Sequence, residues 1–178
     1  MSGPQKISNL VLIGFMGTGK SSVGRMVADQ LRFAFLDTDQ MIEAGAGKSV
    51  SEIFAAEGEA GFRERERRLV EELRQRTNTV ISTGGGLPAN PENLASLKTH
   101  ALVVCLWAGP EKIWERVRNQ SHRPLLQDPD PQLKIRSLLA AREPFYRQAG
   151  VLVDTEMRSI KEVAQQVIHQ YRLARSGH

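Results

Sequence analysis

The chain has 178 residues, which is the length of one globular domain with a sizeable buried core. Hydrophobic residues make up 40% and charged residues 25%, as in water-soluble globular proteins, and the single cysteine, Cys105, excludes a disulfide framework within the chain. The net charge of +4 arises from scattered basic residues with only 6% aromatics, which speaks against a nucleic-acid-binding surface and favours anionic small molecules as ligands.

The sequence also lacks the signals of export and membrane insertion. The first nine residues, MSGPQKISN, contain no apolar run of the kind found in signal peptides, and no apolar segment approaches the length of a membrane span. Together with the lone cysteine, this predicts a cytoplasmic protein. We expect neither nucleic acid nor a membrane as a partner, and we expect a monomer.

Short apolar runs alternate with longer amphipathic segments along the whole chain. The apolar runs, several of them rich in Val, Ile and Leu, predict strands at 10–15, 34–37, 79–83, 101–107 and 151–155. Capping boxes begin two of the intervening segments, Ser49 with Glu52 and Ser159 with Glu162, and predict helices there. This alternation predicts a single α/β domain over 1–178, with a parallel sheet and helices on its faces.

A phosphate-binding loop follows the first predicted strand. Residues 14–21, GFMGTGKS, fit the pattern G-x-x-x-x-G-K-[ST], between a strand and an amphipathic helix as the motif requires. The glycines allow backbone N–H groups to approach phosphate oxygens, and the helix directs its positive end at the same anion. Lys20 adds a positive charge near the β- and γ-phosphates, and Ser21 offers a hydroxyl to Mg²⁺. The alternative is a strand–turn–helix with chance glycines.

A nucleoside triphosphate site suits either a GTPase-like switch or a kinase. Switches of that type carry an Asn-Lys-x-Asp stretch and an Asp-x-x-Gly loop, and neither occurs in this sequence. The absence of both favours a kinase that passes the γ-phosphoryl group to an acceptor.

The second predicted strand ends in LDTD, with Asp37 and Asp39 two residues apart. In an extended segment both carboxylates would point to the same side, at the carboxyl end of a parallel strand where ligands bind. One would help to hold the water shell of a metal, and the other would accept the proton of an attacking hydroxyl. The alternative is that these aspartates cap a helix or form a turn.

Four further segments each allow a functional and a purely structural interpretation. Gly84–Gly86 in TGGG indicate either close approach to a ligand or a flexible loop. The 62–76 helix is crowded with arginines that mostly form a solvated face, and spacing does not tell whether one binds an anionic acceptor. The polar segment 119–132, with Arg123, is either a mobile lid or a plain surface loop. Arg142 is either an anion clamp or a surface arginine, before Pro144, which we expect to end or kink a helix.

Taken together, these motifs resemble the shikimate kinases over nearly the whole chain. The matching pieces are GFMGTGKSSVG, FLDTD, GEAGFRERE, TGGG, RPLL, REPFY and the final VDT before a helix. The resemblance implies the fold of the nucleoside monophosphate kinases, with a five-stranded parallel sheet in the order 2-3-1-4-5. It also implies transfer of the γ-phosphoryl group of ATP to the 3-hydroxyl of shikimate, with Mg²⁺, on the route to chorismate and the aromatic amino acids.

The resemblance assigns roles that spacing leaves open. Arg63 and Arg142 would hold the shikimate carboxylate, Asp39 would bind the substrate hydroxyls and serve as base, and Asp37 would lie on the metal side, acting through water. Arg123 would be the lid arginine that reaches the ATP phosphates. Gly85 would give a backbone N–H to the substrate. The implied ATP-binding residues are Gly17, Thr18, Gly19, Lys20, Ser21, Ser22, Arg123 and Arg158, the last against adenine; the implied substrate residues are Asp39, Arg63, Gly84, Gly85, Gly86 and Arg142.

Within the single domain, the resemblance makes 40–77 the substrate-binding segment and 119–132 the lid. Two other functions remain as alternatives. One is a different small-hydroxyacid kinase of the same fold, such as a gluconate kinase, which gives no reason for FLDTD together with GFRERE. The other is an ATP-binding regulatory module without turnover.

Overall fold

A five-stranded parallel sheet forms the centre of the molecule in the computed structural model, which describes residues 6–177. The strands are β1 (Asn9–Ile13), β2 (Ala34–Asp37), β3 (Thr79–Ser82), β4 (Ala101–Trp107) and β5 (Val151–Asp154). Their order is β2-β3-β1-β4-β5, and every neighbouring pair is parallel. The predicted fold class and strand order are thus confirmed.

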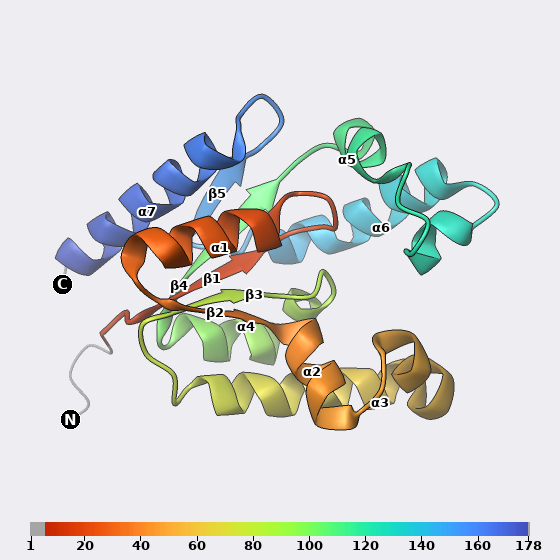
Figure 1. The fold of residues 1–178 in the computed structure, drawn as a ribbon, viewed down its shortest axis with the longest axis horizontal. Helices are drawn as coiled ribbons and strands as arrows, with labels where there is room; N and C mark the ends of the chain where they lie inside the picture. Colours follow the sequence, from red (N-terminus) through yellow and green to blue (C-terminus); the bar gives the residue numbers. More distant parts are fainter. Residues whose placement is uncertain (1–5, 178) are drawn as a thin grey trace.

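Helices cover both faces of this sheet (Figure 1). They are α1 (Lys20–Leu31), α2 (Thr38–Ala46), α3 (Val50–Leu73), α4 (Pro91–Lys98), α5 (Pro110–Val117), α6 (Pro131–Tyr146) and α7 (Ile160–Ser176), with 3₁₀ turns at η1 (Leu87–Ala89) and η2 (Pro124–Gln127). Helices α1 and α7 lie over one face, while α3 and α4 lie over the other. The result is a three-layer α/β domain.

The central strand β1 is buried on both faces, as its continuous apolar sequence predicts. Its side chains alternate between two cores. Val11 and Ile13 belong to the cluster shared with α3, α4 and α6, whereas Leu10 and Leu12 belong to the cluster under α1 and α7. The sheet is therefore fixed from both sides, and its carboxyl edge becomes a rigid base for the loops that follow each strand.

The observed helix boundaries confirm the two predicted capping boxes and differ from two other predictions. Both capping boxes are formed, at Ser49 and Ser159. The helix expected over 62–76 is the second half of α3, which begins at Val50, changes direction at Gly58 (φ 69°) and ends at Leu73. Helix α6 continues through Pro144 and ends two residues later, because a proline near the end of a helix removes few backbone hydrogen bonds.

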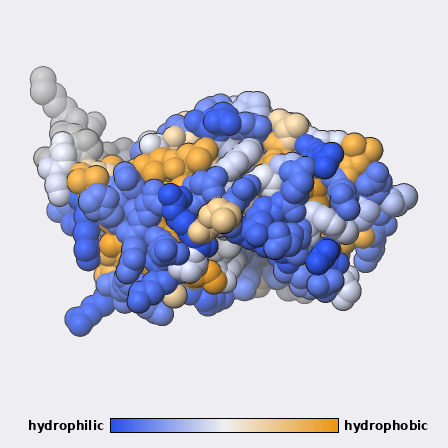
Figure 2. Space-filling view, turned by 90° about the horizontal axis from the view of Figure 1, so that it is seen from above, coloured by the Kyte–Doolittle hydropathy of each residue, from blue (hydrophilic) through white to orange (hydrophobic). Residues whose placement is uncertain are grey.

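The outer surface of the α1 and α7 side is largely hydrophilic, with apolar side chains in small separate groups (Figure 2). Between residues 6 and 177, no helix combines the length and the apolar character needed to cross a membrane.

Candidate active site

The loop between β1 and α1 has the shape of a phosphate cradle. Gly14 and Gly17 both have positive φ, at 142° and 75°. A side chain on Gly14 would overlap the carbonyl oxygen of Leu106, and one on Gly17 would lie 2.7 Å from Val117. The loop therefore packs directly against β4 and α5, which only glycine permits. The Thr18 hydroxyl is buried and donates to the Phe15 carbonyl over 2.8 Å, which tightens the turn.

Lys20, the first residue of α1, bends back over this loop. Its Nζ donates to the carbonyl oxygens of Gly14 (2.8 Å) and Phe15 (2.9 Å). Burial lowers the pKa of Lys20 to about 8, although the nearby Asp39 carboxylate opposes the shift. A phosphate entering the loop would offer this ammonium group a full negative charge in place of two carbonyl dipoles.

A cavity of about 510 Å³ opens beside the loop, at the carboxyl edge of the sheet. It brings together most of the residues that the sequence nominates: Gly17, Gly19, Lys20, Ser21, Ser22, Asp37, Asp39, Gly84, Gly85, Arg123 and Arg142. Met16, Ser82, Thr83, Arg116 and Gln120 complete its lining. Groups suited to a nucleotide phosphate and groups suited to an acceptor thus share one space.

Asp37 and Asp39 both line the cavity, but they do not lie on one extended segment as predicted. Strand β2 ends at Asp37 and α2 begins at Thr38, because Asp37 caps the helix by accepting a hydrogen bond from Gln40 N over 3.1 Å. The capping alternative is therefore correct for Asp37. Its other oxygen, Oδ2, lies 3.4 Å from the Ser21 hydroxyl. Asp39 lies in the first turn of α2. The direction of its side chain is therefore set by helical geometry and not by the alternation of a strand.

The carboxylate of Asp39 is desolvated. Burial and the neighbouring Asp37 raise its pKa, while Lys20 and Arg63 act in the opposite direction. Its Oδ1 has no hydrogen-bond partner among residues 6–177. A buried carboxylate oxygen without a donor is costly, and a ligand hydroxyl would satisfy it.

The three glycines after β3 make room for three charged side chains. A β-carbon on Gly84 would lie 2.6 Å from Asp39 Oδ1, one on Gly85 would lie 3.1 Å from an Arg142 nitrogen, and one on Gly86 would lie 2.5 Å from an Arg63 nitrogen. None of the three has a positive φ. They are needed for space against these side chains, which argues against a flexible loop, while close approach to a ligand stays a prediction.

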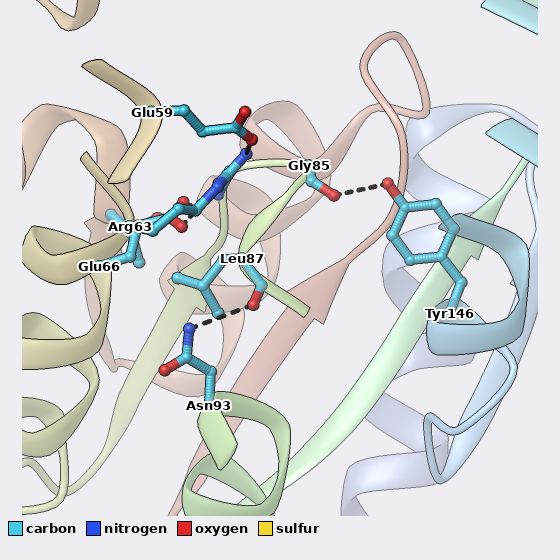
Figure 3. Close-up of polar contacts among 9 residues, drawn as sticks. Glu59, Arg63, Glu66, Gly85, Leu87, Asn93 and Tyr146 are labelled. Carbon is cyan, nitrogen blue, oxygen red and sulfur yellow. Dashed lines mark hydrogen bonds and ion pairs between the residues drawn. The ribbon is translucent and has the colours of Figure 1, made fainter. Parts of the chain in front are cut away.

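Side chains from three helices fasten this glycine loop. Gly84 N–H donates to the Thr38 hydroxyl (3.0 Å), the Tyr146 hydroxyl donates to the Gly85 carbonyl (2.7 Å), and the Asn93 amide donates to the Leu87 carbonyl (3.2 Å). Figure 3 shows the last two contacts, the first at Gly85 and the second at Leu87. Sequence reasoning missed these three residues, because Thr38 and Tyr146 lie 46 and 61 residues from their partners along the chain, and Asn93, six residues from Leu87, belongs to no motif.

Arg63 does not line the large cavity, but it lies against Gly86 at its margin. It donates to the buried Glu66 over 2.7 Å and to the exposed Glu59 over 3.4 Å (Figure 3). Its neighbour Arg65 makes a two-pronged ion pair with Glu57 on the outer surface. The two arginines therefore differ in their surroundings, since Arg63 lies against the glycine loop and Arg65 pairs with a glutamate outside the site.

A second cavity of about 330 Å³ adjoins the first around Gly17 and Gly19. Thr18 and Arg158, both nominated for ATP, line this space and not the larger one. The Arg158 guanidinium donates to the Asp154 carbonyl over 2.7 Å, at the end of β5. The second cavity extends from the phosphate loop toward the start of α7, where Ser159, Ile160 and Val163 form its wall.

Arg116 lies between the two cavities and was not predicted from the sequence. Its guanidinium donates to the carbonyl of Gly17 (3.0 Å) and to both the hydroxyl (3.0 Å) and the carbonyl (2.7 Å) of Thr155. It thereby ties the phosphate loop to the segment after β5. The polar face of α5 carries several charged residues at equivalent helical positions, so spacing gave no reason to select this one.

The lid candidate 119–132 contains η2 and leads directly into α6. Arg123 precedes η2, and its Nε donates to Gln120 Oε1 over 2.5 Å. Nineteen residues farther on, Arg142 faces the same cavity from α6, with its guanidinium 5.6 Å from the centre of the Phe15 ring. Two cations thus approach the phosphate loop from one continuous segment.

A phosphate loop, a five-stranded parallel sheet and acceptor-binding groups in one cavity define a P-loop kinase acting on a hydroxyl group. Comparison with known proteins gives the particular family, since the shikimate kinase family model matches residues 16–172. A shikimate kinase from Caldanaerobacter subterraneus is 46% identical over 165 residues, covering 93% of this chain and 96% of the relative. The structure of shikimate kinase from Acinetobacter baumannii in complex with shikimate superposes with a TM-score of 0.87 at 38% identity, covering 93% of each chain. This chain belongs to the shikimate kinase family.

The gluconokinase-like alternative has support only in the fold. A gluconokinase from Sinorhizobium meliloti superposes with a TM-score of 0.65 at 18% identity, covering 96% of each chain. Such a likeness reflects the shared architecture and carries no information on the acceptor.

Proposed function

We propose that this chain transfers the γ-phosphoryl group of ATP to the 3-hydroxyl of shikimate, giving shikimate 3-phosphate and ADP for chorismate and aromatic amino acid synthesis. The observation that carries the proposal is the shared cavity. Lys20 of the phosphate loop, the desolvated Asp39 and the guanidinium of Arg142 line one space. An acceptor with a carboxylate at one end and a hydroxyl at the other fits this charge arrangement.

We assign the nucleotide to the phosphate loop and the second cavity. Backbone N–H groups of Gly17–Ser22 and the positive end of α1 would bind the phosphates, with Lys20 neutralising the transferred group. Arg123 would approach from the lid. The adenosine part would extend into the second cavity, between Arg116 and Arg158. The planar Arg158 guanidinium would stack on the base without hydrogen-bond selectivity.

Ser21 and Asp37 suit a magnesium ion carried by the nucleotide. A hydroxyl and a carboxylate 3.4 Å apart are hard oxygen donors beside the loop, of the kind that Mg²⁺ prefers. In the part of the chain that the structure describes, no group of three acidic, His or Cys side chains is placed to hold a metal alone. When bound, Mg²⁺ would neutralise the charge that develops on the phosphates.

The acceptor end of the cavity would fix shikimate by three contacts. Arg63 and Arg142 would bind its carboxylate, the Gly84–Gly86 backbone would border its ring, and Asp39 would accept a hydrogen bond from its hydroxyl. Because phosphoryl transfer is dominated by positioning and electrostatics, the main work of these residues is to hold the hydroxyl in line with the γ-phosphate. Asp39 would take the proton as the new bond forms.

We further propose that 40–77 binds the acceptor, that 119–132 closes over the nucleotide, and that the protein acts as a cytoplasmic monomer. The regiochemistry is tested by converting shikimate completely and locating the phosphate by ³¹P–¹H correlation. Coupling to the proton on C3 is the expected result. Coupling to another ring position would mean that a different hydroxyl faces Asp39.

A further inference from the structure

The hydroxyl of Tyr146 makes a short and buried contact with the glycine loop. It donates to the carbonyl oxygen of Gly85 over 2.7 Å, and the residue is 1% exposed. Figure 3 shows the ring reaching from α6 toward the loop, on the side opposite Arg63. The rest of the ring packs in the core cluster that contains Phe15 and Leu139, so the ring has no freedom to follow a moving loop.

This contact determines the orientation of one peptide group. The Gly85 carbonyl and the Gly86 N–H belong to the same planar unit and point in opposite directions. Glycine residues on both sides give the backbone little intrinsic resistance to rotation. The N–H groups of Gly85 and Gly86 donate to no other group among the described residues, although their neighbours Gly84 and Leu87 do. The Gly84–Gly85 peptide is held within the loop, because its carbonyl accepts from Leu87 N–H, whereas the Gly85–Gly86 peptide is held through the Tyr146 contact.

The same helix carries a cation that lies against Gly85. Arg142 precedes Tyr146 by four residues, which places both side chains on one face of α6. A β-carbon on Gly85 would lie 3.1 Å from the Arg142 guanidinium and 3.5 Å from the Tyr146 hydroxyl. Loop and cation are thus set relative to each other through one rigid helical turn.

We propose that Tyr146 is a positioning residue for the acceptor: its hydroxyl fixes the Gly85–Gly86 peptide relative to Arg142, so that backbone donors and guanidinium meet the same substrate. This rests on the proposed function, because the acceptor is taken to be shikimate. Burial raises the pKa of Tyr146 to about 12, so the phenol remains a hydrogen-bond donor at all working pH values.

The first test is Tyr146→Phe, which removes one oxygen and keeps the ring. We expect KM for shikimate to rise about three- to tenfold, as the loss of one hydrogen bond implies, with KM for ATP changed by less than about twofold. Tyr171→Phe is the matched control. Tyr171 is equally buried, packs edge-on against Phe33 in the other core, and its hydroxyl has no partner among residues 6–177. It should leave both KM values unchanged.

A purely structural role for the hydroxyl would give a different result. Tyr146→Phe would then lower the melting temperature and raise both KM values in parallel, or change neither, and either outcome would overturn the proposal. Wild-type protein without shikimate-dependent turnover would instead refute the proposed function. The two failures are therefore distinguishable in the same set of assays.

A second measurement avoids any dependence on the stability of the Phe variant. Replacing Tyr146 by a fluorinated tyrosine that ionises near neutral pH keeps the shape of the side chain. Ionisation would turn a donor into an anion facing the Gly85 carbonyl. We expect KM for shikimate to rise with pH in this protein and to stay level in the wild type over the same range. Identical pH profiles would contradict the proposal.

Discussion

The Arg63 guanidinium donates to Glu66 Oε2 over 2.7 Å, and Glu66 is only 1% exposed. Burial raises the pKa of Glu66, although the hydrogen bond from Arg63 opposes the shift, and its second oxygen, Oε1, has no partner among residues 6–177. Arg63 thus has two roles. It neutralises the charge of the buried Glu66 carboxylate, and its guanidinium also lies against Gly86, at the margin of the cavity. Any test of its role in substrate binding has to separate these contributions.

Arg63→Ala should weaken shikimate binding by about 2–5 kcal/mol, because a desolvated carboxylate would lose its charged partner. The same change leaves Glu66 unpaired, so we expect a loss in unfolding free energy of about 2–3 kcal/mol as well. Titration calorimetry with shikimate and with ATP, beside denaturant unfolding, separates the two. Arg142→Ala should show the binding defect for shikimate. Arg65→Ala, whose partner Glu57 is on the surface, should show neither effect, and a binding defect confined to Arg65→Ala would refute the assignment.

Gly86→Ala should act on substrate binding through Arg63. A β-carbon there would lie 2.5 Å from the guanidinium, which is the flexible end of its side chain, so the arginine would be displaced and the fold would persist. We expect KM for shikimate to rise about tenfold, with KM for ATP nearly unchanged. Gly45→Ala, in α2 with open space around it, is the control and should stabilise the protein by up to about 1 kcal/mol without altering either KM. Equal kinetics for the two variants would show that Gly86 reserves no functional space.

The lowered pKa of Lys20 predicts that kcat/KM for ATP falls in alkaline solution. Its pKa is lowered to about 8 in the free protein by burial, so the ammonium loses its proton as pH rises through that value. We expect kcat/KM for ATP to fall above about pH 8, whereas kcat at saturating ATP declines only at higher pH, because bound phosphates favour the charged form. Lys20→Ala should lose about 10²–10³ in rate below about pH 8, where the wild-type lysine is charged. A pH profile for kcat/KM that stays flat to the ordinary lysine range would contradict this account.

Asp39→Asn distinguishes a catalytic base from a group that only positions the acceptor. Asparagine has the same size and can still accept a hydrogen bond, but it cannot take a proton. Base catalysis predicts a fall in kcat of roughly 10²–10⁴-fold with shikimate affinity moderately reduced. Because the pKa of Asp39 is raised, wild-type activity should decline on acidification at a pH above the ordinary aspartate range, and Asn should remove that limb. A variant that keeps its kcat and loses only affinity would make Asp39 a positioning group.

Segment 119–132 should close when both substrates are bound. Arg123 is attached here to Gln120 over 2.5 Å, and closure would redirect it toward the phosphates. We expect amide hydrogen exchange in this segment to slow markedly with an ATP analogue plus shikimate, and less with either alone. The β1 amides, which lie in the buried centre of the sheet, provide the internal reference. Unchanged exchange in the ternary complex would count against a lid.

Local sequence signals predicted the parts of the site that are local in the chain. The phosphate loop and the TGGG segment are each one unbroken stretch of sequence. Their glycines are required by the backbone conformation or by the lack of space for a side chain at their own positions. The extended course from Asp37 to Asp39 was predicted wrongly, because AFLD passes into α2 without a turn residue and the helix begins at Thr38, directly after the strand. Arg116 and Tyr146 depend on how α5 and α6 pack against loops 39 and 61 residues away from them in sequence, which no spacing rule encodes.

The most direct test of the proposed activity is ADP release with a panel of acceptors, measured in parallel with ATP and Mg²⁺ at fixed concentrations. The panel is shikimate, quinate, gluconate and AMP. These acceptors differ in whether they carry a carboxylate or a phosphate and in whether the carboxylate is attached to a ring. We expect kcat/KM for shikimate to exceed that for each of the others by at least about 10², since a misplaced hydroxyl or carboxylate leaves charged groups of the cavity unpaired. Turnover with gluconate or AMP equal to that with shikimate would contradict the proposed acceptor.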